Sequence, residues 1–251
     1  MVGRSKAGES ASTAELRFGE FLQLTTEARE FLANLFGPPQ SLARQHVLRH
    51  DGDPPTHLYL LVEGWVSASL AVTSGKQQTV KIHLPGDVLG APSLPVARAA
   101  EALTALTPVV VRSVSRADFM TAVARCPRFA VSVFLSAQKE RLALMSTLAL
   151  VGQTEGGSRI AGMLIDLYDR LTVLGRTEGG HMPLPLTQHQ IGELVGLSPV
   201  HVNRKIREFE QAGLILRETR TVQLLDIDKL REMAGLTAHE YLRDPEWISL
   251  P

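Results

Sequence analysis

The chain has 251 residues, of which 44% are hydrophobic, so it has room for one large domain or two ordinary ones with real cores. Its 26 basic and 26 acidic residues cancel, so any attraction to nucleic acid must come from local placement of charge. The single cysteine, Cys126, excludes an intrachain disulfide and a cysteine-ligated iron–sulfur cluster within one chain, which fits a reducing cytoplasm. No run approaches the roughly eighteen apolar residues of a membrane span, and the start lacks the apolar segment of a secretory signal. We therefore expect a cytoplasmic protein with no membrane partner.

The first segments are predicted to be a tail followed by short helices. Residues 1–14 are rich in glycine, serine and alanine, which predicts a flexible tail. Residues 15–36 carry apolar side chains at helical spacing, so we expect one or two short amphipathic helices there. Gly37 and the two prolines that follow it end this helical region.

From residue 42 to residue 114 the chain changes to short alternating runs with turn residues between them. The predicted strands are 46–50, 57–62, 65–72, 78–84, 102–106 and 109–114. Regular short strands of this kind predict an antiparallel barrel or roll. Residues 115–126 predict a short helix, in which Ser115 and Asp118 form a capping box.

Residues 128–151 form a long helical run, which would be about 35 Å long at 1.5 Å per residue. Its broad apolar surface consists of Phe129, Val133, Ser136, Ala137, Leu142, Leu144, Met145, Leu148 and Val151. The run is either an internal core helix or a helix that pairs with a second copy of the chain, and we favour the second interpretation. Residues 152–158 are then predicted to be a hinge, 158–174 an amphipathic helix, and 175–185 a loop.

Residues 187–215 have the pattern of two helices joined by a short turn. Thr187 and Gln190 have the spacing of a capping box at the start of the first helix. Gly196 suits the positive φ of a turn, and Ser198 is placed to cap the second helix. Pro199 follows at the first helical position, where its missing N–H costs nothing.

The second of these helices has one apolar and one polar face. The apolar stripe is Val202, Ile206 and Phe209, and the polar face carries His201, Arg204, Lys205 and Glu208. An apolar pair at 214–215 leads into an alternating run up to residue 225, which predicts a small hairpin. Although packed helix pairs are common, this combination is typical of a winged helix-turn-helix, whose second helix lies in a DNA major groove.

Three stretches carry a resemblance to a known family: LYLLVEGWV at 58–66, LPGDVLG at 84–90, and LTQHQIGELVGLSPVHVNRKIREFEQAGLI at 186–215. Together with the order of roll, long helix, hinge and winged helix-turn-helix, they resemble the Crp/Fnr superfamily of bacterial transcription regulators. The resemblance implies a homodimer, joined through residues 128–151, that binds a pseudo-palindromic site on double-stranded DNA. It also implies that an effector in the roll moves the DNA-binding domains, and that RNA polymerase is recruited or blocked.

The implied fold class is α+β, with an N-terminal antiparallel, jelly-roll-like β-roll, a long dimerisation helix and a C-terminal winged helix-turn-helix. The expected boundaries are a tail at 1–14, a roll sensor domain with flanking helices at 15–127, a dimerisation helix at 128–153, a DNA-binding domain at 154–234 and a C-terminal extension at 235–251.

The resemblance also assigns DNA contacts. Arg204 matches an arginine used for base recognition, because an arginine can bind guanine through two hydrogen bonds. Ser198 matches a phosphate contact, and His201 is placed to reach phosphate or base. Further candidates are Thr187, Gln188, Asn203, Lys205, Arg207 and, in the wing, Arg220. The cyclic-AMP-type readers commonly have arginine and glutamate where this chain has Pro199 and Val200, so their half-site preference is not carried over. Val200 could instead contact a thymine methyl group.

The cyclic-nucleotide pocket of this family needs an arginine beside a hydroxyl residue for the phosphate, and a glutamate for the ribose. The glutamate position is Ala91 here, and the arginine position falls near Ala99 and Ala100, with Arg98 as a shifted substitute. The candidate effector-pocket residues are Leu89, Gly90, Ala91, Arg98, Ser146 and Thr147. We expect no cyclic AMP binding, since a buried phosphate without a partner is strongly penalised. A cyclic-nucleotide-responsive regulator stays the alternative.

Four histidines in or near the roll keep two other interpretations open: His46, His50, His57 and His83. They leave haem open as a ligand, because imidazole is a good metal ligand. They also allow a cupin-like metal-binding enzyme, although a cupin site needs a His-x-His pair, which this chain lacks. We expect no catalytic residues, no cofactor and no metal site, and we expect Cys126 to be a small apolar residue before Pro127.

Overall fold

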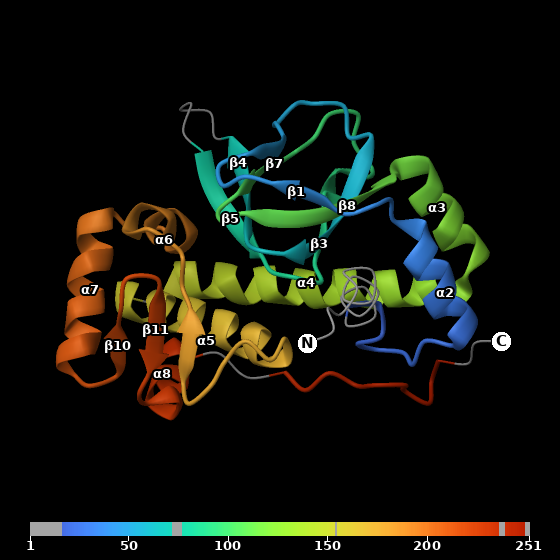
Figure 1. Ribbon diagram of the computed structural model, residues 1–251. Coiled ribbons are helices and arrows are strands. Elements are labelled where there is room, and N and C mark those ends of the chain that lie inside the picture. Colours follow the sequence, from blue (N-terminus) through green and yellow to red (C-terminus); the bar gives the residue numbers. More distant parts are fainter. Residues whose placement is uncertain (1–16, 72–76, 154, 236–238, 249–251) are drawn as a thin grey trace, which may run out of the picture. The chain divides into compact units, whose positions relative to one another are not determined.

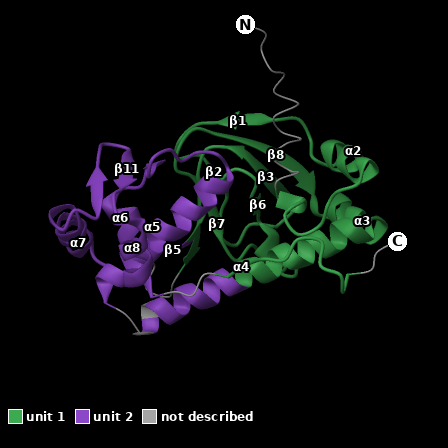
Figure 2. Cartoon of the chain, turned by 90° about the horizontal axis from the view of Figure 1, so that it is seen from below, with its two compact units in different colours: residues 1–77, 81–141, 239–251 green, residues 78–80, 142–238 purple. Residues whose placement is uncertain are grey.

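The computed structural model describes residues 17–71, 77–153, 155–235 and 239–248, so the tail predicted at 1–14 lies outside the described residues. The chain divides into two compact units, one made of residues 1–77, 81–141 and 239–251 and the other of 78–80 and 142–238 (Figure 2). Within the described ranges, no single helix is long and apolar enough to span a membrane. One pair of helices bent by 115°, Arg116–Arg125 with Pro127–Leu150, meets the length and composition requirement only jointly.

The N-terminal unit contains two four-stranded antiparallel sheets (Figure 1), which confirms the predicted roll. Their orders are β1-β8-β3-β6 and β2-β7-β4-β5. The strands are β1 (Gln40–Leu42), β2 (Val47–Arg49), β3 (His57–Glu63), β4 (Val66–Ala71), β5 (Gln77–His83), β6 (Val88–Leu89), β7 (Ala102–Ala105) and β8 (Val109–Ser115). A short 3-10 turn, η1 (Ala91–Ser93), follows β6. The sequence analysis did not predict the short strands β1 and β6.

A glycine turn joins the two sheets. Gly64 lies between β3 and β4 with a φ of +86°, and a Cβ atom there would be only 2.3 Å from the carbonyl oxygen of Pro108. Both the backbone angle and this close approach require glycine. The motif at 58–66 therefore combines a buried strand with the turn that lets the chain cross to the second sheet.

Helices cover the sheet that contains β3, and an aromatic cluster forms the core between them. They are α2 (Thr26–Leu35), α3 (Arg116–Arg125) and the N-terminal part of α4 (Pro127–Gln153). Phe129 is fully buried, with its ring centroid 4.9 Å from that of Phe18 and 5.5 Å from that of Phe119, both in edge-on geometry. The capping box predicted at Ser115 is confirmed in part, since the Ser115 side chain accepts a hydrogen bond from the Asp118 amide.

The second unit contains the C-terminal part of α4, a small sheet and the helices α5 (Gly156–Val173), α6 (Gln188–Val195), α7 (Pro199–Gln211) and α8 (Ile227–Ala234). The sheet has the order β10-β11-β9 and consists of β9 (His181–Pro183), β10 (Ile215–Arg217) and β11 (Thr221–Leu224). Strands β10 and β11 form the predicted hairpin. The prediction of a loop through 175–185 was wrong in part, because β9 pairs with β11 as a third strand.

The hinge predicted at 152–158 is shorter than expected. Helix α4 continues to Gln153 and α5 begins at Gly156, so glycines taken as breakers lie inside helices. Gly156 lies in a tight contact, because a Cβ atom there would be 3.0 Å from Cδ1 of Leu197. A glycine near a helix end can therefore mark a close approach of another segment.

Candidate DNA-binding site

The supporting helix α6 begins with the predicted capping box. The Thr187 side chain accepts a hydrogen bond from the Gln190 amide at 3.2 Å, and the Gln190 side chain accepts one from the Thr187 amide at 2.9 Å. Two amide groups that the helix itself cannot satisfy are thereby paired. Thr187 is exposed at this helix start, where unpaired backbone N–H groups favour an anion such as a phosphate.

The turn between α6 and α7 depends on two glycines. Gly196 ends α6 with a φ of +69°, as its position in the sequence predicted. Gly192 was missed: a Cβ atom there would be 2.4 Å from the Leu197 carbonyl oxygen, while the Gly192 carbonyl accepts from the Leu197 amide at 2.9 Å. The signal that could have revealed it is a glycine within a strongly periodic helix, which often marks a close backbone approach.

The C-terminal end of α6 is held by a long-range contact. Arg159 of α5 donates from Nη1 to the Val195 carbonyl oxygen at 2.9 Å. A cation at a helix C-terminus pairs with carbonyl groups that have no partner within the helix. Together with Gly192, this contact sets the position from which α7 starts.

Helix α7 begins at its predicted cap. The Ser198 Oγ accepts from the His201 amide at 3.3 Å and lies 2.9 Å from His201 Nδ1. One face of the helix is buried through the three apolar residues predicted for it, Val202, Ile206 and Phe209. Because that face packs inward, the opposite face of the helix points away from the core of the unit.

The outward face near the start of α7 carries three of the predicted contact residues. Val200 is 77% exposed, His201 is exposed, and the side chain of Arg204 is 62% exposed. Arg204 Nε lies 3.7 Å from a carboxylate oxygen of Glu208, which is a loose ion pair at the surface. Such exposed pairs are weak, so the guanidinium can exchange this partner for a base or a phosphate.

Most of the other predicted contact residues already bond to neighbouring side chains. Gln188 Nε2 donates to Asn203 Oδ1 at 3.1 Å, so these two side chains tie α6 to α7. Lys205 Nζ is 2.7 Å from Glu208 Oε2, and its side chain is mostly covered. Arg207 is exposed on α7.

Arg220 lies at the tip of the wing. Its side chain is exposed in the turn between β10 and β11, and its carbonyl oxygen accepts from the Leu184 amide at 2.8 Å. The wing tip is therefore positioned by a backbone contact to the segment before α6, while its guanidinium stays available for a phosphate.

The residues expected at the effector pocket are only partly brought together. Leu89 and Gly90 are buried and Ala91 is half-buried, in β6 and at the start of η1. Arg98 is exposed and donates to the Gly52 carbonyl oxygen at 3.1 Å, so it does not replace a buried phosphate-binding arginine. Ser146 and Thr147 lie on α4 in the second unit. Sequence reasoning missed the arginine that is buried against Gly90, which is Arg49 of β2.

The histidines of the roll do not converge. His46, His50 and His57 are exposed, whereas His83 is buried with Nδ1 3.2 Å from an Asp87 carboxylate oxygen. Burial lowers the pKa of His83, and the Asp87 hydrogen bond opposes that shift only in part. In the part of the chain that the structure describes, no group of three His, Cys, Asp or Glu side chains is placed to hold a metal ion. Cys126 is half-buried against the aromatic core.

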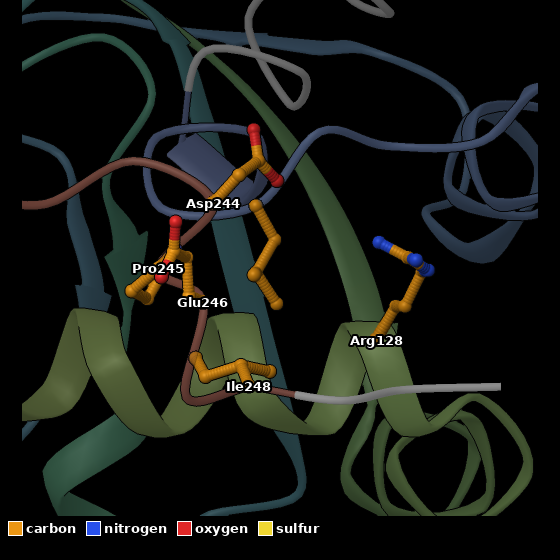
Figure 3. A pocket seen from close by; sticks show the side chains of 6 residues that line it. Arg128, Asp244, Pro245, Glu246 and Ile248 are labelled. Atoms are coloured by element: carbon orange, nitrogen blue, oxygen red, sulfur yellow. The ribbon is translucent and has the colours of Figure 1, made fainter.

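The C-terminal extension returns to the N-terminal unit. The Asp244 amide donates to the Phe21 carbonyl oxygen at 2.8 Å, and its carboxylate accepts from the Gln23 amide at 2.7 Å. Beside this contact lies a small open pocket lined by Leu22, Arg128, Asp244, Pro245, Glu246 and Ile248 (Figure 3). Trp247 is mostly exposed.

Comparisons with known proteins agree with this geometry. Residues 158–233 match the family model of the Crp-like helix-turn-helix domain, and residues 39–126 match that of the cyclic nucleotide-binding domain. The CRP-like cAMP-activated global transcriptional regulator of Mycobacterium tuberculosis is 28% identical over 200 residues, covering 78% of this chain and 88% of that protein. The transcriptional regulatory protein btr of Bordetella pertussis is 28% identical over 193 residues, covering 73% of this chain and 75% of that protein.

Solved structures show the same fold. FixK2 from Bradyrhizobium japonicum superposes with a TM-score of 0.72 at 23% identity, covering 80% of this chain and 98% of that one. A CRP-family transcriptional regulator from Thermus thermophilus gives a TM-score of 0.64 at 24% identity, covering 78% and 97%. The chain therefore belongs to the Crp/Fnr superfamily of bacterial transcription regulators, with a cyclic-nucleotide-binding-like roll and a DNA-binding helix-turn-helix domain.

Proposed function

We propose that this transcription regulator acts as a homodimer on a pseudo-palindromic DNA site, with one α7 helix in each of two successive major grooves. The observation that supports this most directly is the outward face at the start of α7, where Val200, His201 and Arg204 are exposed opposite a buried apolar stripe. Arg204 reads a guanine, Val200 contacts a thymine methyl group, and Ser198, Lys205 and Arg207 contact the backbone.

The dimer is proposed to form along α4. This helix exposes Phe134 in its N-terminal half and Leu144, Met145 and Leu148 in its C-terminal half, and Leu148 is 72% exposed. Contiguous apolar surface of this kind on a soluble protein marks an interaction site. A second copy of the same helix is a suitable partner, because two DNA-binding domains must be held together to span two half-sites.

Four further properties belong to this proposal. The protein works in the cytoplasm, where its DNA lies, and it controls transcription by recruiting or blocking RNA polymerase. It carries no catalytic activity of its own, in line with the regulators among its relatives. Its roll does not take cyclic AMP, because Ala91 and Ala99–Ala100 stand where the family's pocket has glutamate, arginine and a hydroxyl residue.

A cyclic-nucleotide-responsive regulator is the second candidate. It is favoured by the match of residues 39–126 to the cyclic nucleotide-binding domain and by the name of the Mycobacterium tuberculosis relative. Titration calorimetry with cyclic AMP separates the two candidates. We expect no measurable heat, and micromolar binding would favour the second candidate. Haem is the other ligand that the sequence analysis left open. Absorption spectra recorded after incubation with haem test it, and we expect no bound haem.

DNA selection and molar mass test the main proposal. The 251-residue protein should select a two-fold symmetric site from a randomised DNA pool and should have the mass of a dimer in light scattering. Leu148→Glu should give a monomer that binds the selected site far more weakly. Val173→Glu is the matched control, since Val173 is an equally exposed apolar residue on α5 and its change should leave the dimer intact. A monomeric wild-type protein, or a selected site without symmetry, would contradict the proposal.

A further inference from the structure

A buried ion pair lies inside the roll at residues that no sequence motif singled out. Arg49 Nη2 is 2.9 Å from Glu101 Oε1, and only 5% and 7% of the two side chains are exposed. The same nitrogen lies 3.2 Å from the Ser93 Oγ, which is fully buried. A charge this far from water must be neutralised locally, so each member of the pair requires the other.

The pair occupies the place where the sequence predicts an effector. The Arg49 guanidinium lies against Gly90, where a Cβ atom would be 2.7 Å from Nη1. Ser93 also accepts a hydrogen bond from the Ala100 amide at 3.1 Å. The guanidinium is thus enclosed by residues from both segments that would face a nucleotide, the one at Gly90 and the one at Ala100.

We propose that Glu101 serves as an internal anion that takes the place of an effector's phosphate, so that the Arg49–Glu101 pair fills the effector position and the roll needs no anionic ligand. This deepens the proposed function and rests on it, since it concerns how a Crp/Fnr-type regulator without a cyclic AMP response is built. A phosphate entering beside the pair would place a second negative charge in the same buried space. The pair therefore disfavours a cyclic nucleotide by charge as well as by occupancy.

The remaining hydrogen-bond capacity of Arg49 offers a test. Among the described residues, Nε and Nη1 of Arg49 have no hydrogen-bond partner. If the Glu101 carboxylate is removed, the whole guanidinium becomes a binding site for a small added anion, because an unpaired buried cation is strongly unfavourable.

Thermal unfolding of the 251-residue chain in a phosphate-free buffer provides the measurement. Glu101→Ala should lower the melting temperature by about 6–20 °C. Replacing chloride by acetate or formate at constant ionic strength should recover at least half of that loss, because a small carboxylate fits the space of the deleted one. The double variant Arg49→Met with Glu101→Ala is the matched control, and acetate should leave its melting temperature unchanged. The wild-type protein should not respond to acetate, inorganic phosphate or cyclic AMP.

Two results would overturn the proposal. One is a wild-type melting temperature that rises with cyclic AMP or phosphate, which would mean that the roll accepts an anionic ligand beside the pair. The other is a folded Glu101→Ala protein that acetate does not stabilise more than the double variant. If Glu101→Ala does not fold in the chloride buffer, it is refolded in acetate or formate buffer, and a variant that folds no better there than in chloride would overturn the proposal. These unfolding measurements need no DNA, so failure to select a DNA site would refute the proposed function without deciding this inference.

Discussion

Replacing Arg204 by alanine separates the contribution of this side chain to base recognition from its contribution to the stability of the fold. The side chain is 62% exposed, and its ion pair with Glu208 is loose at 3.7 Å, so its loss should cost the fold at most about 0.5 kcal/mol. A bidentate contact to guanine discriminates by about 1–3 kcal/mol in each half-site, which is about 2–6 kcal/mol for a dimer on both half-sites. Preference for the selected site over a scrambled one should therefore fall about 30-fold to 10⁴-fold.

Fluorescence anisotropy with the selected and the scrambled duplex, at one fixed salt concentration, gives the ratio of the two dissociation constants. Arg204→Lys is the matched variant, because it keeps the positive charge but loses the planar fork that reads guanine. It should keep much of the affinity for the scrambled duplex and lose most of the preference. Thermal unfolding should shift by no more than about 2 °C in either variant.

An unchanged ratio of dissociation constants in Arg204→Ala would refute the reasoning, since it would mean that the exposed face of α7 does not read bases. A melting temperature that falls by about 10 °C would contradict the predicted small effect on stability, because it would show that Arg204 stabilises the fold. Loss of affinity for both duplexes by the same factor would assign Arg204 to a phosphate contact instead.

Three other predictions follow from the same structure. Contacts to phosphate from Lys205, Arg207 and Arg220 of each subunit should make the slope of log K against log salt about −5, and a flat response would contradict these contacts. Gly192→Ala should destabilise the helix-turn-helix by about 1–3 kcal/mol in denaturant unfolding, because its Cβ would be 2.4 Å from a backbone oxygen. The control is Gly152→Ala, whose Cβ would meet nothing within 4 Å, and equal effects would refute this role. The pKa of buried His83 is below its usual value of 6.5, so as pH falls below 6.5 the unfolded chain takes up a proton that the folded protein resists. Wild-type stability should therefore decrease there by up to about 1.4 kcal/mol per pH unit, and His83→Gln should flatten this slope in pH-dependent denaturation. Identical slopes would show that His83 is not responsible.

Local signals in the sequence were sufficient to predict the helix-turn-helix. Capping at Thr187 and Ser198, the positive φ at Gly196 and the apolar stripe of α7 each involve residues within a few positions of one another. Because helix caps and helical periodicity act over one or two turns, the sequence alone determines which face of α7 is exposed. The same kind of local signal predicted the seven-residue strands β3 and β8, whereas the short strands β1, β6 and β9 were missed.

Tertiary structure decided what depends on residues far apart in the chain. Arg49 and Glu101 are 52 positions apart, and only the pairing of β2 with β7 brings them together inside the roll. The sequence shows Gly192 only as a glycine within a periodic helix, and its packing against the Leu197 carbonyl oxygen is seen only in the structure. The role of Arg159 likewise depends on the end of α6 lying beside it. Sequence patterns report the preference of a segment for a helix or strand, whereas the pairing of buried charges and the closest backbone contacts depend on how segments pack, which no local pattern encodes.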